Sequence, residues 1–271
     1  MTKKNKSAIQ RRLIPTYIFL IIVSFISVFP LYWMISAATN TSTDVSRGRI
    51  IPGSHFMENF RNLTSQQPLW RALGNSFFYA ILTTVICLLI CSIAGYGFEV
   101  YHDKWKDRVF SILLLAMMVP QVATMVPLFK MFSKAGLLNT AVGFILPIIS
   151  TPFMIMMFRQ NARSFPVDII EAARIDGLNE VRIFFQMFIP TMKSTYAAAA
   201  VITFMNAWNS YLWPKVIMTD NKAMTMPMLI ANLITGYVTD YGMLMCGVLF
   251  CSIPTMIVFF VLQKQLSLIH I

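Results

Sequence analysis

Six apolar stretches, each about 20 residues long, constrain this sequence more than any other feature. A helix of about 20 apolar residues spans the hydrocarbon core of a bilayer. The chain is 57% hydrophobic and only 12% charged, whereas soluble domains carry about 25% charged residues. The sequence therefore predicts an all-helical, polytopic membrane protein with six transmembrane helices. They are expected at residues 13–38, 72–98, 109–129, 141–158, 191–213 and 241–262.

The stretch "MMVPQVATMVPLF" makes the third apolar run irregular. It contains Pro120, Gln121 and Pro127, and a proline inside a helix removes a backbone hydrogen bond. We expect a kinked helix here, whose freed carbonyls face protein or water.

The distribution of Lys and Arg predicts which side of the membrane each loop occupies. Cytoplasmic loops are enriched in these two residues. Of the 22 in the chain, 14 lie in the two ends and in the loops after the second and fourth runs, and the other eight lie in the remaining loops. We therefore expect both termini in the cytoplasm, with a tail at 1–12 and an extracytoplasmic loop at 39–71. The basic excess is explained by this orientation, so no nucleic-acid partner is needed.

The first apolar run follows a basic tail, as the core of a secretory signal does. It is much longer than the 7–15 apolar residues of such a core, so we interpret residues 13–38 as a retained anchor.

Several functional motifs are absent from the sequence. It contains no G-x-x-x-x-G-K-[ST] phosphate loop. Its histidines are isolated, and its four cysteines lie in apolar runs, where such side chains pack. The middle of the spans carries almost no ionisable residue, which argues against a proton relay but leaves a sodium site built of carbonyls open. We expect no catalytic or metal site, and any uphill transport would take its energy from another subunit.

The loop at 159–190 is unusually polar for this chain. In "SFPVDIIEAARIDG", Ser164 can cap a helix and Pro166 suits its first turn. Ile169, Ile170 and Ala173 are predicted to share one face of that helix. The pattern indicates a short amphipathic helix.

A bend and a second helix follow. Gly177 can adopt the left-handed conformation that ends a helix, and Asn179 can cap the next one, with Phe184, Phe185 and Phe188 on one side. From the pattern alone, this segment is either a connection seated in the lipid headgroups or a docking element for a partner.

"EAARIDG", separated by twelve residues from Pro190, resembles the cytoplasmic loop signature of membrane subunits of binding-protein-dependent ABC importers. "FPLYWMIS", "MENFRNL", "NSFFYAI", "IAGYGF", "MMVPQVATMVPLF", "GLLNTAVGFILP", "AWNSYLWP" and "LQK" resemble, in this order, the maltose-type sugar permeases. Together these motifs cover nearly the whole chain.

The resemblance implies a type I ABC importer permease fold, with a permease core at 72–264 and a coupling loop at 159–190. It implies one subunit of a di- or oligosaccharide importer in the bacterial inner membrane. The implied partners are a homologous second permease, a dimer of ATPase subunits that binds ATP and Mg, an extracytoplasmic sugar-binding protein and membrane lipid. The chain itself would hold no cofactor and would not be an enzyme. The sugar-binding protein is expected to dock on residues 39–71, 219–241 and the loop between the third and fourth runs.

The resemblance also assigns roles within the loop. Glu171 would pair with a basic residue in a groove of the ATPase, and Ala172 and Ala173 would let the helix seat there. The next residues would form the bend and start the fifth span. The residues assigned to ATPase coupling are Glu171, Ala172, Ala173, Asp176, Gly177 and Pro190.

The sequence departs from the family pattern at two places. Glu99 stands where the family usually has a basic residue. Residues 265–271 end in "LSLIHI", which is atypical of the family, and we interpret this end as an artefact of a truncated gene prediction.

The segment "FMNAWNSYLWP" is the candidate substrate pathway. Asn206, Asn209 and Tyr211 offer polar groups to sugar hydroxyls, and Trp208 offers an apolar face. The alternatives are that the aromatic residues mark the membrane interface and that the asparagines join helices.

Two other functions are compatible with a six-span chain. An ion-coupled secondary carrier would work without ATP and without partners. A membrane receptor or scaffold would not transport at all.

Overall fold

The computed structural model describes residues 3–235 and 239–267, with side chains for residues 13–235 and 239–263. All regular secondary structure in these residues is helical. The chain divides into two compact units, one formed by residues 1–67 and 232–250 and the other by residues 68–231 and 251–271. The prediction of an all-helical fold is confirmed.

The first unit contains the N-terminal helix α1 (Lys3–Ala38) and the short helices α2 (Ser42–Ser46) and α3 (Phe56–Gln66). Asn59 of α3 holds the chain after α1, because its Nδ2 donates to the carbonyl oxygens of Ala38 and Asn40 at 2.9 Å each. The extracytoplasmic loop predicted at 39–71 therefore includes two helices, and its last residues already belong to the next span.

Three of the predicted spans are continuous helices that are long and apolar enough to cross a membrane. They are Leu13–Ala38 within α1, the whole of α4 (Leu69–Val100), and Tyr241–Gln263 within α15 (Tyr241–Ser267). Helix α1 remains exposed along most of its apolar length, as expected of a helix whose side chains face lipid.

The other three predicted spans are interrupted or short. Helices α5 (Lys104–Ala116) and α6 (Gln121–Lys134) meet at an angle of 100°, so the expected kink before Pro120 is confirmed as a sharp bend. The fourth run is divided into α7 (Ala141–Ile145) and α8 (Pro152–Ala162), and the fifth is α12 (Lys193–Trp208), which has 16 residues. By length and composition, the described residues contain three such spans, or up to four if the bent pair forms one span.

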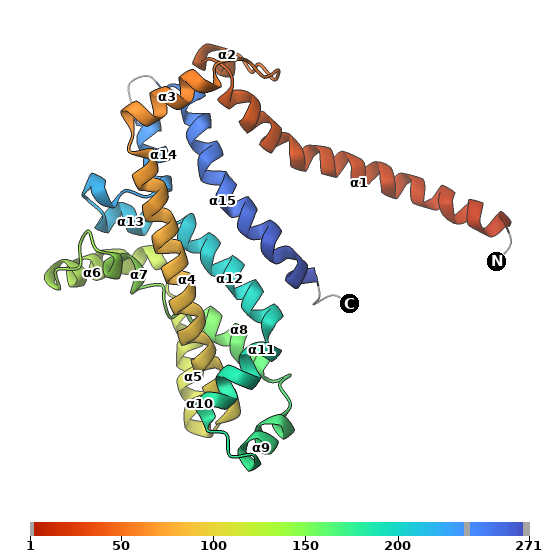
Figure 1. Cartoon of the computed structure of the whole chain (residues 1–271), viewed down its shortest axis with the longest axis vertical. Helices are drawn as coiled ribbons and strands as arrows, with labels where there is room; N and C mark the ends of the chain where they lie inside the picture. The colour runs from red at the N-terminus through yellow and green to blue at the C-terminus, as the bar shows by residue number, and fades with distance from the viewer. Residues whose placement is uncertain (1–2, 236–238, 268–271) are drawn as a thin grey trace. The chain divides into compact units, whose positions relative to one another are not determined.

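Helix α4 is the centre of the second unit and packs along α8 and α12 (Figure 1). Close approach depends on small residues: a Cβ at Gly95 would lie 2.6 Å from Cβ of Phe158. Ala199 of α12 is fully buried in a cluster with Cys87, Cys91 and Phe158. The small-residue stretches at residues 92–97 and 197–200 thus serve helix packing, and Cys87 and Cys91 are packing residues as predicted.

Shorter helices complete the second unit. In Figure 1, α10 lies beside the C-terminal end of α4, and α9 lies beyond that end. The remaining elements are α9 (Val167–Ile175), α10 (Glu180–Ile183), a π-helical turn (Phe184–Phe188), α11 (Ile189–Thr191), α13 (Leu212–Ile217), a 3-10 turn (Asn221–Ala223) and α14 (Met226–Ile234), whose last residues belong to the first unit.

Candidate functional site

The polar loop forms a bent segment of residues 164–190, here called the elbow. Helix α9 ends at Ile175, Asp176 is its C-terminal cap, and Gly177 follows with φ of +81°, in the left-handed region that favours glycine. Asn179 then caps α10, since its Oδ1 accepts from the backbone N–H of Arg182 at 2.9 Å. The predicted helix, bend and second cap are confirmed.

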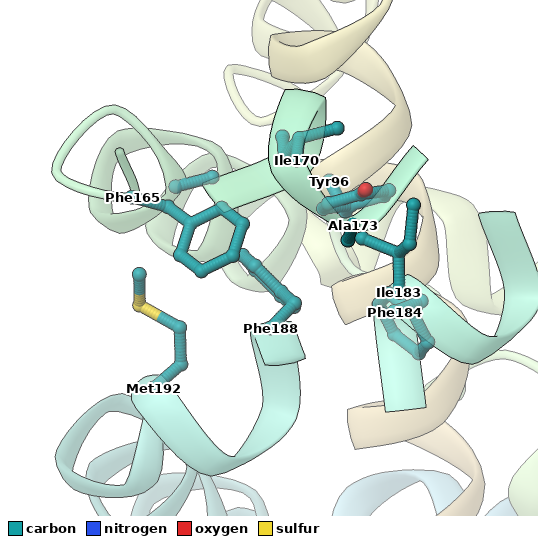
Figure 2. Packing of buried hydrophobic residues seen from close by; sticks show 9 residues of the cluster. Tyr96, Phe165, Ile170, Ala173, Ile183, Phe184, Phe188 and Met192 are labelled. Atoms are coloured by element: carbon teal, nitrogen blue, oxygen red, sulfur yellow. The ribbon is translucent and has the colours of Figure 1, made fainter. Parts of the chain in front are cut away.

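A cluster of apolar side chains packs the inside of the elbow (Figure 2). Phe188 is fully buried, and its ring centroid lies 4.8 Å from that of Tyr96 on α4 and 5.5 Å from those of Phe165 and Phe184. Ile170 of α9 completes the contact between the elbow and α4. This packing joins the elbow to the longest helix of the second unit, so the two parts are expected to move together.

Three details of the predicted elbow are wrong. Ser164 does not cap α9; its hydroxyl donates to the carbonyl oxygen of Asn161 at 2.6 Å, and Pro166 takes the cap position before the first turn. Ile169 was expected to share a face with Ile170 and Ala173, which are buried, but it is 38% exposed. Phe185 was expected on one side with Phe184 and Phe188, which are also buried, but it is 49% exposed. Neighbouring residues point about 100° apart around a helix, so an adjacent pair does not share a narrow buried stripe.

A polar cluster ties the two helices of the elbow to the end of α4. Arg174 of α9 pairs with Glu180 of α10, with Nε to Oε1 at 2.7 Å, and the Tyr101 hydroxyl donates to the other carboxylate oxygen of Glu180. The Arg174 guanidinium and then the Tyr101 hydroxyl lower the pKa of Glu180 below its ordinary value of 4.5. Burial, and then the bond to Glu180, raises the pKa of Tyr101.

The outward face of α9 is exposed and combines one charge with apolar side chains. Val167, Glu171 and Ile175 follow one another at four-residue intervals, which places them along one side of the helix. Ile175 is 87% exposed. Within the described residues, Glu171 makes no ion pair. Two exposed apolar side chains, Val167 and Ile175, thus lie along the same side of α9 as this carboxylate.

The structure separates the residues assigned to ATPase coupling into two groups. Glu171, Ala172 and Asp176 are exposed, whereas Ala173 is buried in the cluster inside the elbow. Pro190 lies in the single turn of α11, just before α12. Ala173 therefore faces its own chain.

A buried arginine links α8 to α4 and to α5 through ion pairs. Arg159 of α8 contacts Glu99 of α4 through Nε at 3.2 Å and Asp107 of α5 through Nη2 at 2.5 Å, and its guanidinium lies 4.3 Å from the ring centroid of Phe110. Arg163 also reaches Glu99, at 3.5 Å. The unusual acid at position 99 thus has a structural reason, because it forms ion pairs with Arg159 of α8 and with Arg163, which follows the last residue of α8.

A cavity of about 760 Å³ lies where several helices of the second unit break, and we call it the helix-break cavity. Its wall includes residues from the breaks between α5 and α6, between α7 and α8, and between α12 and α13, together with residues of α4. Asn206, Asn209 and Tyr211 belong to this wall. Trp208 does not; it is buried, stacks on Phe204 and donates from Nε1 to the carbonyl oxygen of Cys251 at 3.0 Å.

Sequence reasoning missed other polar residues of the same wall. Thr83 and Thr203 come from the middle of α4 and α12, and Gln121 is the first residue of α6. The signal for Gln121 was present, because it directly follows the proline that breaks the helix. Threonines in apolar helices carry no comparable signal, since their hydroxyls usually bond to their own backbone.

Comparison with known proteins gives consistent results. The profile of the family described as binding-protein-dependent transport system inner membrane component matches residues 88–267. The chain is 40% identical to the lactose transport system permease protein LacG of Rhizobium radiobacter, over 96% of each chain. It is 36% identical to the arabinooligosaccharides transport system permease protein AraQ of Halalkalibacterium halodurans, over 89% of this chain and 88% of the relative.

The fold is similar to that of a chain in the crystal structure of a bacterial ABC transporter involved in the import of the acidic polysaccharide alginate. The TM-score is 0.82 at 20% sequence identity, over 97% of this chain and 98% of the other.

Proposed function

The chain belongs to the family of binding-protein-dependent transport system inner membrane components, and we propose that it is the permease subunit of an ATP-driven importer of di- or oligosaccharides. The relatives LacG and AraQ are named as permeases for lactose and arabinooligosaccharides, which supports a sugar as cargo. The chain is a multi-pass protein of the inner membrane. In this proposal both termini face the cytoplasm.

The observation that carries the coupling part of the proposal is the construction of the elbow. Its inner face is packed against α4 through Phe188 and Tyr96, and its outer face presents Glu171 and Ile175 to a partner. A helix that is tightly packed on one side moves as a rigid body with whatever grips its other side. The elbow therefore converts movement of a docked protein into movement of α4.

The docked protein in this proposal is an ATPase subunit, one of a pair that binds ATP and Mg. Glu171 pairs with a basic residue of its groove, and Ala172, which is exposed, allows close approach. Asp176 and Gly177 set the bend, and Pro190 begins the return into the membrane. A second, homologous permease subunit and an extracytoplasmic sugar-binding protein complete the importer, and the chain itself hydrolyses no ATP.

ATP-driven sugar uptake in proteoliposomes that contain the complete importer tests the proposal. Gly177→Pro is expected to abolish uptake while the protein still inserts, because proline cannot adopt the φ of +81° found here. Glu171→Lys is expected to weaken uptake and to leave the ATPase activity uncoupled from it. Gly177→Asn is the matched control, since asparagine tolerates the left-handed region.

Cysteine cross-linking tests the contact itself. A cysteine introduced at the exposed Ala172 is expected to form a disulfide with a cysteine in the ATPase groove, whereas one at Ser133, at the far end of α6, is not. If uptake persists without ATP in a sodium or proton gradient, the chain is an ion-coupled carrier. If no ATPase co-purifies and the elbow variants alter only assembly or signalling, the chain is a receptor or scaffold.

A further inference from the structure

One face of helix α5 is exposed along its whole length, and we call it the α5 stripe. Its positions recur at intervals of three and four residues, which share one side of a helix. The exposed side chains on it include Lys104, Trp105, Arg108, Ser111, Ile112 and Leu115. The opposite face, with Phe110 and Leu113, packs against α4 and α8 (Figure 1). The α5 stripe therefore begins with basic side chains and ends with apolar ones.

The basic residues of the α5 stripe have no acidic partner in the described part of the chain, where Lys104 and Arg108 form no ion pair. The two aspartates nearest to them in sequence are already engaged. Asp103 pairs with Lys106 at 3.0 Å, and Asp107 pairs with an arginine of α8 on the packed side. The stripe thus presents two positive charges that these neighbouring acids do not balance.

The backbone at the start of α5 is also engaged. Oδ1 of Asp103 accepts from the N–H groups of Trp105 and Lys106 at 2.8 and 2.9 Å, so these two groups of the first turn already have an acceptor. An anion at the α5 stripe would therefore be bound by the side chains of Lys104 and Arg108.

The length and the order of the α5 stripe match one leaflet of a bilayer. Residues 104 to 115 extend over about 16 Å of helix, which is about half of a hydrocarbon core of about 30 Å. Helix α5 is the first half of the bent pair that is long and apolar enough to form a span. Trp105 is 70% exposed beside the basic residues, and tryptophan is enriched at the level of the lipid headgroups. Ile112 and Leu115 follow at the depth of acyl chains.

We propose that the α5 stripe binds an anionic phospholipid, with Lys104 and Arg108 bonding to its headgroup phosphate and Ile112 and Leu115 contacting its acyl chains. A phosphate accepts charge-assisted hydrogen bonds from both basic residues. A zwitterionic headgroup also carries a positive amine, which the same two residues repel. The site therefore prefers a lipid of net negative charge, such as phosphatidylglycerol. This inference goes beyond the proposed function, since it concerns neither the cargo nor the ATPase.

Quenching of Trp105 fluorescence tests the site in the assembled importer in nanodiscs. The contribution of Trp105 is the difference between the unsubstituted importer and its Trp105→Phe variant. The probes are phosphatidylglycerol and phosphatidylcholine, each brominated near the headgroup end of its acyl chains and titrated into unlabelled phosphatidylcholine. Phosphatidylglycerol is expected to quench half of the Trp105 signal at a mole fraction at least about tenfold lower than phosphatidylcholine, because two basic residues attract it.

Substitution of the basic residues identifies the groups that bind. Lys104→Gln and Arg108→Gln are each expected to raise the half-quenching mole fraction of phosphatidylglycerol about fivefold and to leave that of phosphatidylcholine unchanged. The matched control combines Lys130→Gln and Lys134→Gln, at two exposed lysines of α6 with the same four-residue spacing and no ion pair within the described residues. This control removes the same total charge but is expected to leave the quenching of Trp105 unchanged.

Four results would overturn the inference. Quenching by neither lipid would mean that another subunit covers the α5 stripe, and equal half-quenching mole fractions would mean that the stripe does not select the headgroup. An equal effect of the α6 control would mean that only total charge attracts the lipid. Inorganic phosphate, titrated at constant ionic strength, is expected to leave the quenching by phosphatidylglycerol unchanged, and its displacement of the lipid would indicate a site for a free anion instead.

Discussion

The elbow and the helix-break cavity belong to the same compact unit but differ in how fully their side chains are packed and hydrogen-bonded. In the elbow, apolar groups are packed and polar groups are paired, as Phe188 in its aromatic cluster and Glu180 with Arg174 illustrate. In the cavity, the helices break, and the Thr83 hydroxyl has no partner in the described chain. A part that transmits force must satisfy its own contacts, because loose contacts absorb movement. The cavity wall, by contrast, contains bonding groups that nothing in the described chain uses.

Among the changes that test this comparison, removal of the Phe188 ring from the elbow is expected to have the largest effect on stability. Phe188→Ala is expected to lower the free energy of unfolding by about 3–5 kcal/mol, since the residue is fully buried and the space cannot collapse easily. The measurement is the thermal unfolding of the purified complex. Phe185→Ala, at an exposed neighbour, is expected to cost less than about 1 kcal/mol. Equal effects of the two changes would show that the elbow is not held by its cluster.

Loss of the buried arginine should have the next largest effect. Arg159→Met is expected to lower the free energy of unfolding by about 2 kcal/mol. This is less than the 3–5 kcal/mol for a fully buried pair, because Glu99 and Asp107 are partly exposed. Arg163→Met removes an exposed partner of Glu99 and is expected to cost about 1 kcal/mol or less. If both changes leave the unfolding temperature unaltered, the ion pairs of Arg159 and Arg163 do not stabilise the packing of α4, α5 and α8.

Removal of a hydroxyl from the cavity wall should distinguish the two regions most directly. Thr83→Val is expected to leave the free energy of unfolding unchanged or to raise it by up to about 1 kcal/mol, because no described group loses a hydrogen bond. Thr140→Val is the contrasting change. The Thr140 hydroxyl accepts from the N–H of Gly143 at 3.0 Å and caps α7, so its loss is expected to cost about 1 kcal/mol. Destabilisation by Thr83→Val equal to that by Thr140→Val would contradict the difference.

The smallest predicted effect concerns acid. The pKa of Glu180 is lowered from 4.5 by Arg174 and then by Tyr101, so the carboxylate stabilises the elbow above pH 4.5 and loses this effect as the pH falls through the lowered pKa. Glu180→Gln is expected to lower the free energy of unfolding at pH 7 by about 0.2–1 kcal/mol, the amount typical of an exposed ion pair. The variant should therefore unfold at a lower temperature than the unsubstituted chain. The difference should disappear once the pH has fallen below the lowered pKa of Glu180. A difference that grows as the pH falls would contradict the assignment.

Much of the fold was predictable because the membrane imposes strong local rules. The apolar lengths at 13–38, 72–98 and 241–262 identify the continuous helices, and Pro120 marks the bend between α5 and α6. The bend at Gly177 and the cap at Asn179 were also visible, since each depends on the conformational preference of one residue. The breaks within the fourth and fifth runs were not, because apolar composition measures length and says little about where a helix stops.

The sequence by itself determined that this chain is a helical membrane protein with a polar elbow and no nucleotide-binding loop of its own. These properties follow from composition and short motifs, which act locally. Only the tertiary structure decided that Ala173 faces inward, that Trp208 is a packing residue, that Glu99 pairs with two arginines, and that Thr83 shares a cavity with Asn206. Each of these depends on which residues distant in sequence meet, and such contacts are set by how whole helices pack.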